Sequence, residues 1–170
     1  SGFQPKIIAA GSGKEAYDDF GTAFRQHQDA FVVLLVDSEG PVNESGKVWE
    51  HLKSQFGWER PEGAADNQAH LMAQCMEAWF LADPDALAGF YGQGFLRNTL
   101  PKRVNVEEVP KSDVFEVLAR ATRNTRTKGE YHKTHHGFAL LAVVDPSKVR
   151  KAAPHADRLV RAIVKLSSGT

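Results

Sequence analysis

The sequence predicts an α/β fold in which a parallel sheet is flanked by helices. The main observation is a continuous apolar run, FVVLLV at residues 31–36, which is typical of a strand covered on both faces. A shorter candidate strand at residues 6–10 and an amphipathic helix at residues 14–27 precede it. Two strands joined by a helix indicate a right-handed crossover between parallel strands.

The rest of the chain is predicted to be mainly helical. The stretch at residues 67–82 has no helix breaker before Pro84 and is apolar around most of its circumference, so we expect one long buried helix. Aspartate–proline pairs, which are typical of helix starts, occur at 83–84 and 145–146. The further expected elements are short helices at 48–52, 84–90 and 146–151, a weak strand at 104–109, a helix at about 112–121 and a terminal helix at 155–165.

Length and composition are typical of a single domain, which we expect to span residues 1–170. No apolar run is long enough to span a bilayer and no leader segment is evident, so we expect a cytoplasmic protein without a membrane anchor. The single cysteine, Cys75, excludes an internal disulfide and fits a reducing compartment.

The net charge is zero, but the charges are unevenly distributed along the chain. Residues 1–96 carry 6 Lys and Arg against 14 Asp and Glu, a balance of −8, and residues 97–170 carry 15 against 7, a balance of +8. An acidic half with a candidate metal site and a basic, helical half fit a metal-dependent enzyme that acts on a polyanion. Alternatively, the two halves fold together and neutralise each other's surfaces.

Two carboxylates directly follow the apolar strand. Asp37 and Glu39 are two positions apart, so on extended backbone their side chains point the same way. In open α/β sheets ligands bind at the carboxyl ends of strands, and Mg²⁺ is held by one or two carboxylates together with waters and phosphate oxygens. The pair therefore predicts a Mg²⁺ or Mn²⁺ site. A strand end followed by a capped loop is the alternative interpretation.

Three polar residues interrupt the otherwise apolar stretch at residues 67–82. His70, Gln74 and Glu77 are spaced by four and then three residues, which puts them on one face of the predicted helix. A buried carboxylate needs a cation, a hydrogen-bond donor or water. We therefore expect Glu77 to join the two strand-end carboxylates as a metal ligand, and His70 and Gln74 to contact phosphate. The alternative is that this face is a solvated edge.

A basic segment with three histidines lies at residues 120–136. We expect a loop that contacts phosphates, and a merely solvated basic loop is the alternative. A zinc site at His132 and His136 is disfavoured, because no cysteine and no H-E-x-x-H motif accompanies them. The residues expected to bind phosphate or nucleic acid in this segment are Arg126, Lys128, Lys133 and His136.

With FVVLLVDSEG at residues 31–40, AHLMAQCMEAWFLADP at 69–84 and KGEYHKTHHGFALLA at 128–142 in view, the chain resembles a known bacterial family. This is a domain-of-unknown-function family placed with the TOPRIM (topoisomerase–primase) fold. The resemblance implies a Rossmann-like parallel sheet with helices on both faces and a Mg²⁺-dependent site that cleaves phosphodiesters. It also implies an AAA-type or SMC-like ATPase encoded nearby in a defence island.

The family's motif residues can be carried over in part. In TOPRIM proteins a glutamate follows the first strand, and a D-x-D or D-x-E pair follows a later one. Asp37 and Glu39 match the pair, and Glu77 lies in the M-E-x-W-x-L-A-D segment that the family shares. Nothing before Lys6 matches the first glutamate, so we expect the sheet to lack the family's first strand.

Two functions from different classes follow from these patterns. The first is a Mg²⁺-dependent nuclease that serves as the effector of an anti-phage defence system. Its expected catalytic residues are Asp37, Glu39, Glu77 and Lys133, of which the three acidic residues hold the metal. The second is a non-catalytic module that docks on an ATPase partner and binds nucleic acid without cutting it. Either protein could form a homo-oligomer.

Overall fold

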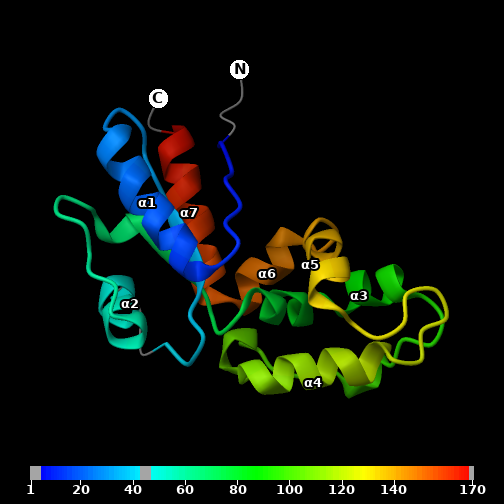
Figure 1. Cartoon of the computed structure of the whole chain (residues 1–170). Helices are drawn as coiled ribbons and strands as arrows, with labels where there is room; N and C mark the ends of the chain where they lie inside the picture. The colour runs from blue at the N-terminus through cyan, green and yellow to red at the C-terminus, as the bar shows by residue number, and fades with distance from the viewer. Residues whose placement is uncertain (1–4, 43–46, 169–170) are drawn as a thin grey trace.

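The computed structural model describes residues 5–42 and 47–168 and has a mixed α/β fold (Figure 1). Two parallel strands form its sheet, and helices make up most of the other described residues. The α-helices are α1 (Gly13–Gln26), α2 (Val48–Phe56), α3 (Pro84–Tyr91), α4 (Lys111–Thr122), α5 (Lys133–Leu141), α6 (Pro146–Ala152) and α7 (Pro154–Ser168). The 3₁₀ helices are η1 (Asp66–Gln68), η2 (Met76–Ala82), η3 (Arg97–Thr99) and η4 (Val106–Glu108).

The sheet consists of β1 (Leu34–Asp37) and β2 (Ala69–Met72), which pair in parallel along their full lengths. Helix α1 packs against β1, and α2 and α7 pack against β2. Apolar side chains of both strands are buried with aromatic side chains from α1 and α2, including Phe20 and Trp49, whose ring centroids are 5.7 Å apart. The predicted parallel sheet with flanking helices is confirmed, and the carboxyl ends of both strands lie at one edge.

A second hydrophobic core lies in the helical part of the chain. It contains apolar side chains from η2, α3, α4, α5 and α6, with Phe80, Leu87 and Leu118 fully buried. In Figure 1 this part lies beside the sheet-bearing part, with α4 at the bottom and α5 and α6 at the top. Helix α7 returns from it to cover β2. Because β2 leads through a short turn into η2, the carboxyl end of the sheet adjoins the helical part.

Residues 67–82 do not form the long helix that their sequence predicts. The elements η1, β2 and η2 follow one another there instead. A stretch that is apolar on nearly every side fits a buried strand as well as a buried helix, and pairing with β1 satisfies the backbone of β2 inside the core. The expected helical face of His70, Gln74 and Glu77 is therefore wrong, because His70 lies in a strand, Gln74 in a turn and Glu77 in a 3₁₀ helix.

The first predicted strand is also wrong. Residues 6–10 form no strand, and the side chains of Ile7 and Ile8 are 86% and 65% exposed. The second predicted strand, at residues 31–36, begins only at Leu34, because its partner β2 offers four residues for pairing. The expected crossover from one strand through α1 to the next is therefore not seen in the described residues.

Two elements of the basic half differ from the prediction as well. Residues 104–109 contain the single turn η4 instead of a strand, because the Asn105 side chain accepts a hydrogen bond from the Glu107 N–H and turns the chain. Residues 133–136, the end of the segment expected to be a basic loop, form the start of α5 (Lys133–Leu141). The basic side chain of Lys133 consequently lies on the first turn of a helix that packs against η2.

The remaining predicted helices are confirmed, with ends that differ by a few residues. Helices α3 and α6 begin with proline after a capping aspartate, as their sequences indicate. The Asp83 side chain accepts from the Ala86 N–H, and the Asp145 side chain accepts from the Ser147 N–H. Within the described ranges, no helix is both long enough and apolar enough to cross a membrane.

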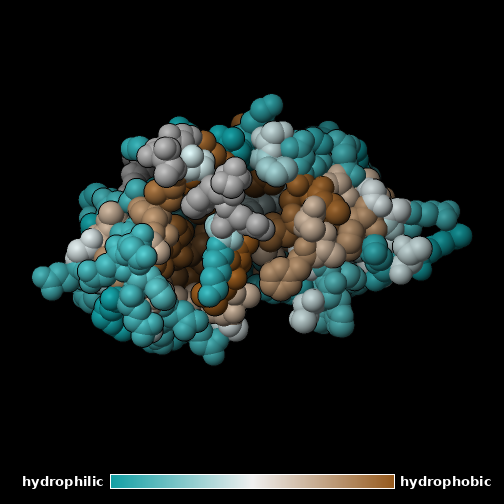
Figure 2. All heavy atoms as spheres, turned by 90° about the horizontal axis from the view of Figure 1, so that it is seen from above, coloured by the Kyte–Doolittle hydropathy of each residue, from teal (hydrophilic) through white to brown (hydrophobic). Residues whose placement is uncertain are grey.

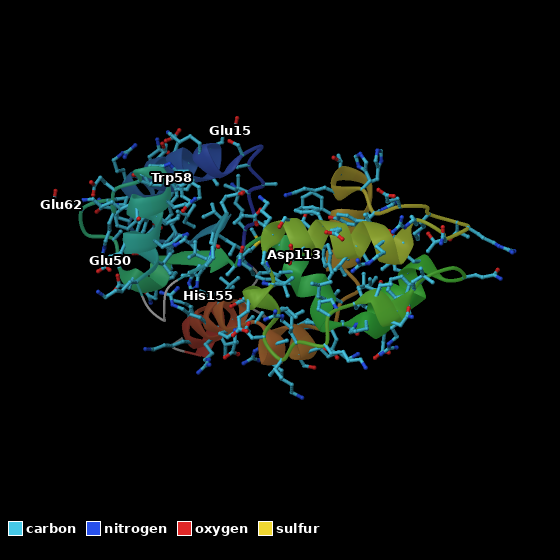
Figure 3. All side chains as sticks on the ribbon, turned by 90° about the horizontal axis from the view of Figure 1, so that it is seen from below. Glu15, Glu50, Trp58, Glu62, Asp113 and His155 are labelled. Carbon is cyan, nitrogen blue, oxygen red and sulfur yellow. The ribbon has the colours of Figure 1, made fainter. Side chains whose placement is uncertain are left out.

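The acidic and basic halves of the sequence fold against each other. Helix α7 of the basic half packs on β2 of the acidic half. In Figure 3 the labelled Glu15, Glu50 and Glu62 lie at the outer rim of the sheet-bearing part. Near the carboxyl end of β1, in contrast, lysines of the basic half pair with carboxylates of the acidic half. The two halves therefore neutralise each other at that position.

Several large apolar side chains remain exposed on the surface. Figure 2 shows apolar surface on the upper face of the molecule, interrupted by hydrophilic side chains. Exposed apolar residues include Ile7, Ile8, Val104, Phe138 and Val143. Scattered apolar exposure is normal for globular proteins, so these side chains do not by themselves indicate a binding surface.

Candidate functional site

Asp37 is the last residue of β1, and its partly buried side chain extends beyond the end of the sheet. The Met76 backbone N–H at the start of η2 donates to Oδ1 over 2.9 Å. The other oxygen, Oδ2, is 3.7 Å from the Lys133 ammonium. Burial raises the pKa of Asp37, the Lys133 charge and the Met76 N–H oppose this shift, and the Glu77 charge adds to it. The strand end thus presents one carboxylate in a crowded, charged environment.

Glu77 lies in η2 and its side chain is completely buried. Its Oε1 accepts a hydrogen bond from the Tyr131 hydroxyl over 3.1 Å and is 3.4 Å from the Lys133 ammonium. Its Oε2 is buried and has no hydrogen-bond partner among the described residues. An unpartnered buried carboxylate oxygen is costly, so this atom indicates a place for a cation or an ordered water.

Lys133 joins the two carboxylates. Its side chain comes from the first turn of α5, and its ammonium lies within 4 Å of oxygens from both Asp37 and Glu77. Burial on its own would lower the pKa of Lys133, but the negative charges of Glu77 and Asp37 outweigh it and raise the pKa. A protonated lysine therefore stands between two carboxylates, which would otherwise repel each other.

Glu39, the third expected metal ligand, has a different partner. Its carboxylate pairs with the ammonium of Lys111, at the start of α4. Its backbone has a φ of 60°, and its N–H donates to the Gln74 carbonyl over 3.0 Å. The Gln74 side chain in turn accepts from the Lys111 backbone N–H over 3.2 Å. Gln74 is thus close to the site, but it orders the loop after β1 instead of facing open space.

Three acidic ligands do not converge as the sequence predicts. Within residues 5–42 and 47–168, no group of three His, Cys, Asp or Glu side chains is arranged to hold a metal ion. The structure brings Asp37 and Glu77 together around Lys133, while Glu39 is held by Lys111. The sequence predicts one helix through this region, but the chain turns between β2 and η2. This turn brings Glu77 to Asp37 and Lys133 and leaves Glu39 with a different partner.

His70 lies in β2 and contacts the terminal helix instead of the carboxylates. Its ring is fully buried, with Nε2 2.9 Å from the Asn67 carbonyl and Nδ1 3.1 Å from the Arg158 guanidinium. Arg158 can only donate, so Nδ1 accepts and Nε2–H donates. Burial, followed by the charges of Arg158 and His155, lowers the pKa of His70 to about 4. His70 is thus a neutral structural residue in a position that offers no contact with phosphate.

The other predicted phosphate ligands lie farther along the basic segment. The Lys128 ammonium lies 4.2 Å from the centre of the Phe90 ring, and the Arg126 N–H donates to the Gln93 carbonyl over 3.3 Å. The His136 Nδ1 is 3.1 Å from the Tyr91 hydroxyl. Burial, followed by the Lys128 charge, lowers the pKa of His136. The Lys128 and His136 side chains thus contact residues of α3, and the backbone of Arg126 bonds to the loop that follows α3.

Sequence reasoning did not assign a role to two residues of the site, Tyr131 and Lys111. Tyr131 is two positions before Lys133, and the residue between them, His132, has extended backbone, so both side chains can reach Glu77. This spacing is the signal that could have found it. Burial, followed by the Glu77 charge, raises the pKa of Tyr131, so its hydroxyl stays a donor. Lys111 follows Pro110 at the start of α4, and no sequence pattern marks it.

The residues of this site all lie within residues 4–164, which match the family model described as a domain of unknown function, DUF4276. The chain belongs to this family. No curated protein and no solved structure matched the chain. The family's description names no activity.

Proposed function

We propose that this DUF4276 protein is a Mg²⁺-dependent hydrolase of phosphodiesters in DNA or RNA. The observation that carries the proposal is the fully buried Glu77 carboxylate, whose Oε2 has no partner among the described residues. It lies beside Asp37 at the carboxyl end of a parallel strand, which is the edge where open α/β sheets bind ligands. A cation bound at Oε2 would offset the free-energy cost of burying that oxygen without a partner.

The donor set fits Mg²⁺ or Mn²⁺. Mg²⁺ is usually held by one or two carboxylates and completes its shell with waters and substrate phosphates. Asp37 and Glu77 would supply these carboxylates, and Glu39 would join them only after leaving Lys111. When bound, the ion polarises a phosphoryl oxygen and lowers the pKa of a bound water. Two-metal chemistry needs ions about 3.5–4 Å apart, so a single ion suits two carboxylates better.

The basic side chains have their own part in the proposed reaction. Hydrolysis joins a water oxygen to phosphorus and breaks the bond to the leaving sugar oxygen, with negative charge spread over the phosphoryl oxygens. Lys133 is the cation nearest to both carboxylates and would stabilise that charge. Arg126, Lys128 and His136 would contact more distant phosphates of the strand.

The finer parts of the proposal rest on the motif resemblance alone. They are a TOPRIM-type fold, a role as effector in anti-phage defence, and an AAA-type or SMC-like ATPase as partner. The D-x-E pair at Asp37 and Glu39 and the segment around Glu77 support them. A pull-down with the ATPase encoded beside the gene tests the partner directly.

Cleavage of supercoiled plasmid and end-labelled RNA tests the activity. We expect the purified protein to nick one of them with Mg²⁺ or Mn²⁺ and to be inactive with EDTA. Asp37→Asn should abolish cleavage, since it removes the ligand charge with little change in shape. Asp18→Asn makes the same chemical change at an exposed aspartate that pairs with Lys14, and should cleave like the parent protein. Equal cleavage by Asp37→Asn and the parent would overturn the proposal.

A second function is favoured by a specific observation. All three acidic residues of the predicted site already have a lysine partner, since Lys133 contacts Asp37 and Glu77 and Lys111 pairs with Glu39. A site neutralised in this way suits a non-catalytic module that docks on an ATPase and binds nucleic acid without cutting it. Mn²⁺ titration separates the two functions: no Mn²⁺ affinity together with retained partner binding favours the module.

A further inference from the structure

We propose that Tyr131 is a positioning residue of the cation site, whose hydroxyl holds Glu77 by Oε1 so that Oε2 remains free for the cation. The inference rests on the proposed function, because it takes Glu77 as a ligand. Tyr131 itself touches neither the cation nor the substrate in this scheme. Its role is to select which oxygen of the buried carboxylate stays available.

The Glu77 carboxylate is partnered through one of its two oxygens, Oε1. The Tyr131 hydroxyl donates to Oε1 over 3.1 Å, and the Lys133 ammonium is 3.4 Å from that same oxygen. Both donors approach one oxygen, and Oε2 has none among the described residues. Without the Tyr131 hydroxyl, the carboxylate could rotate and offer either oxygen to Lys133. The hydrogen bond therefore fixes the orientation of a ligand, which is the usual role of an outer-shell donor.

Tyr131 is itself held in place by hydrogen bonds and ring contacts. Its backbone N–H donates to the Thr122 Oγ1 over 2.7 Å, and this buried hydroxyl donates to the Leu118 carbonyl over 2.7 Å. Its ring packs against Phe80 and Phe115, with ring centroids 6.3 and 6.2 Å away. The backbone of Tyr131 is thus anchored to α4, and its ring is held between Phe80 and Phe115. A donor fixed in this way can impose a geometry on its acceptor.

A Mn²⁺ titration of Tyr131→Phe tests the inference. We expect Mn²⁺ affinity to fall at least about 10-fold, in line with the loss of an outer-shell hydrogen bond. Tyr91→Phe is the matched control, because Tyr91 is at least as buried as Tyr131 and its hydroxyl also makes a side-chain hydrogen bond, to His136. It should bind Mn²⁺ like the parent protein. Similar melting temperatures of the two variants would show that the loss of affinity is not a loss of folding.

The outcomes distinguish this inference from the proposed function. A parent protein that binds no Mn²⁺ overturns the proposed function and this inference with it. A parent protein that binds Mn²⁺, with Tyr131→Phe binding it equally well, overturns the role of Tyr131 alone.

A measurement on the parent protein covers the case in which Tyr131→Phe does not fold. The sequence has three tyrosines, at positions 17, 91 and 131. With ¹³Cζ-tyrosine, the Tyr17→Phe and Tyr91→Phe variants assign the third resonance by elimination. We expect Mg²⁺ to shift the Tyr131 resonance and to leave the Tyr91 resonance in place. Saturation with Mg²⁺ without a shift of the Tyr131 resonance would contradict the inference.

Discussion

Arg158 of α7 donates a hydrogen bond from its Nη1 to the Nδ1 of the buried His70 in β2, over 3.1 Å. The same guanidinium donates to the backbone carbonyls of Ala69 and Asp66, each over 2.7 Å. One side chain of the terminal helix thus satisfies three acceptors at the edge of the sheet. This connection holds α7 on β2, and it explains why His70 is unavailable to a substrate.

Replacing Arg158 tests how much this connection stabilises the fold. Arg158→Met keeps most of the aliphatic stem but leaves three acceptors without their donor, so we expect a loss of about 2–4 kcal/mol in the free energy of unfolding. Urea denaturation followed by circular dichroism measures it. Arg161→Met, one turn along the same helix, removes the exposed partner of Asp157, which keeps Arg150, and should cost less than about 1 kcal/mol. Equal losses in the two variants would show that the connection adds nothing.

The stability of the protein should depend on pH through His70. Its pKa is about 4 in the folded protein and about 6.5 in an unfolded chain, so the unfolded chain binds more protons between these values. Stability should therefore fall as the pH falls from about 6.5 to about 4, by up to roughly 3 kcal/mol from this residue. Urea midpoints measured across that range give the slope.

His70→Gln removes the titrating group while keeping a donor and an acceptor. We expect this variant to be less stable than the parent protein at neutral pH but to show a flatter decline below pH 6.5. His27→Gln changes an exposed histidine and should follow the parent curve. A His70→Gln curve parallel to that of the parent would rule out His70 as the cause.

Glu107 is expected to stabilise the start of α7. Its carboxylate accepts from the His155 N–H over 3.0 Å and from the His155 ring Nδ1 over 2.7 Å (His155 is labelled in Figure 3). A negative charge at a helix N-terminus is favourable, so Glu107→Gln should cost about 1–2 kcal/mol. Glu116→Gln, at an exposed pair with Arg120 in α4, should cost a few tenths of a kcal/mol. Chemical denaturation of both variants measures these losses in the free energy of unfolding, and equal losses would contradict a specific role of Glu107.

Lys133 should compete with a bound cation while it supports cleavage. Under the proposed function, Lys133→Met leaves Asp37 and Glu77 without their shared positive charge, so Mn²⁺ affinity should rise while cleavage falls by at least about 10-fold. Calorimetric Mn²⁺ titration and plasmid nicking measure the two effects. Lys165→Met, at an exposed lysine of α7, should change neither. Weaker Mn²⁺ binding by Lys133→Met would mean that the lysine organises the site instead of occupying it.

Local patterns were sufficient for most helices. Aspartate caps followed by proline mark the starts of α3 and α6, and amphipathic spacing marks α1, α4 and α7, because these signals act within one or two turns. The helix predicted for residues 67–82 was wrong, because the spacing of residues in a continuously apolar stretch does not distinguish a buried strand from a buried helix. The choice was made by β1, which is more than thirty residues away in sequence and supplies the hydrogen bonds of β2.

The site was predictable only in outline. The apolar run at residues 31–36 predicts a strand, and Asp37 stands at its end. Glu77 could be singled out as a carboxylate in an otherwise apolar stretch of sequence. Lys133 was expected at this site, but Tyr131 and Lys111 were not predictable, because Tyr131 reaches Glu77 from the segment before α5 and Lys111 reaches Glu39 from the start of α4. Contacts between such distant segments depend on how helices pack, and no local pattern records that.

By itself, the sequence determined one buried strand with an acidic end and most of the helices, since apolar periodicity and capping residues act over short range; the parallel partner of that strand was decided by the tertiary structure. Only the tertiary structure decided that Glu77 is buried and that, among the described residues, one of its oxygens has no partner. It also decided that Lys133 lies between Glu77 and Asp37, and that His70 accepts a hydrogen bond from Arg158 of α7. The physical reason is that burial and ion pairing are properties of groups brought together by folding, and their energies do not exist until the two cores have formed.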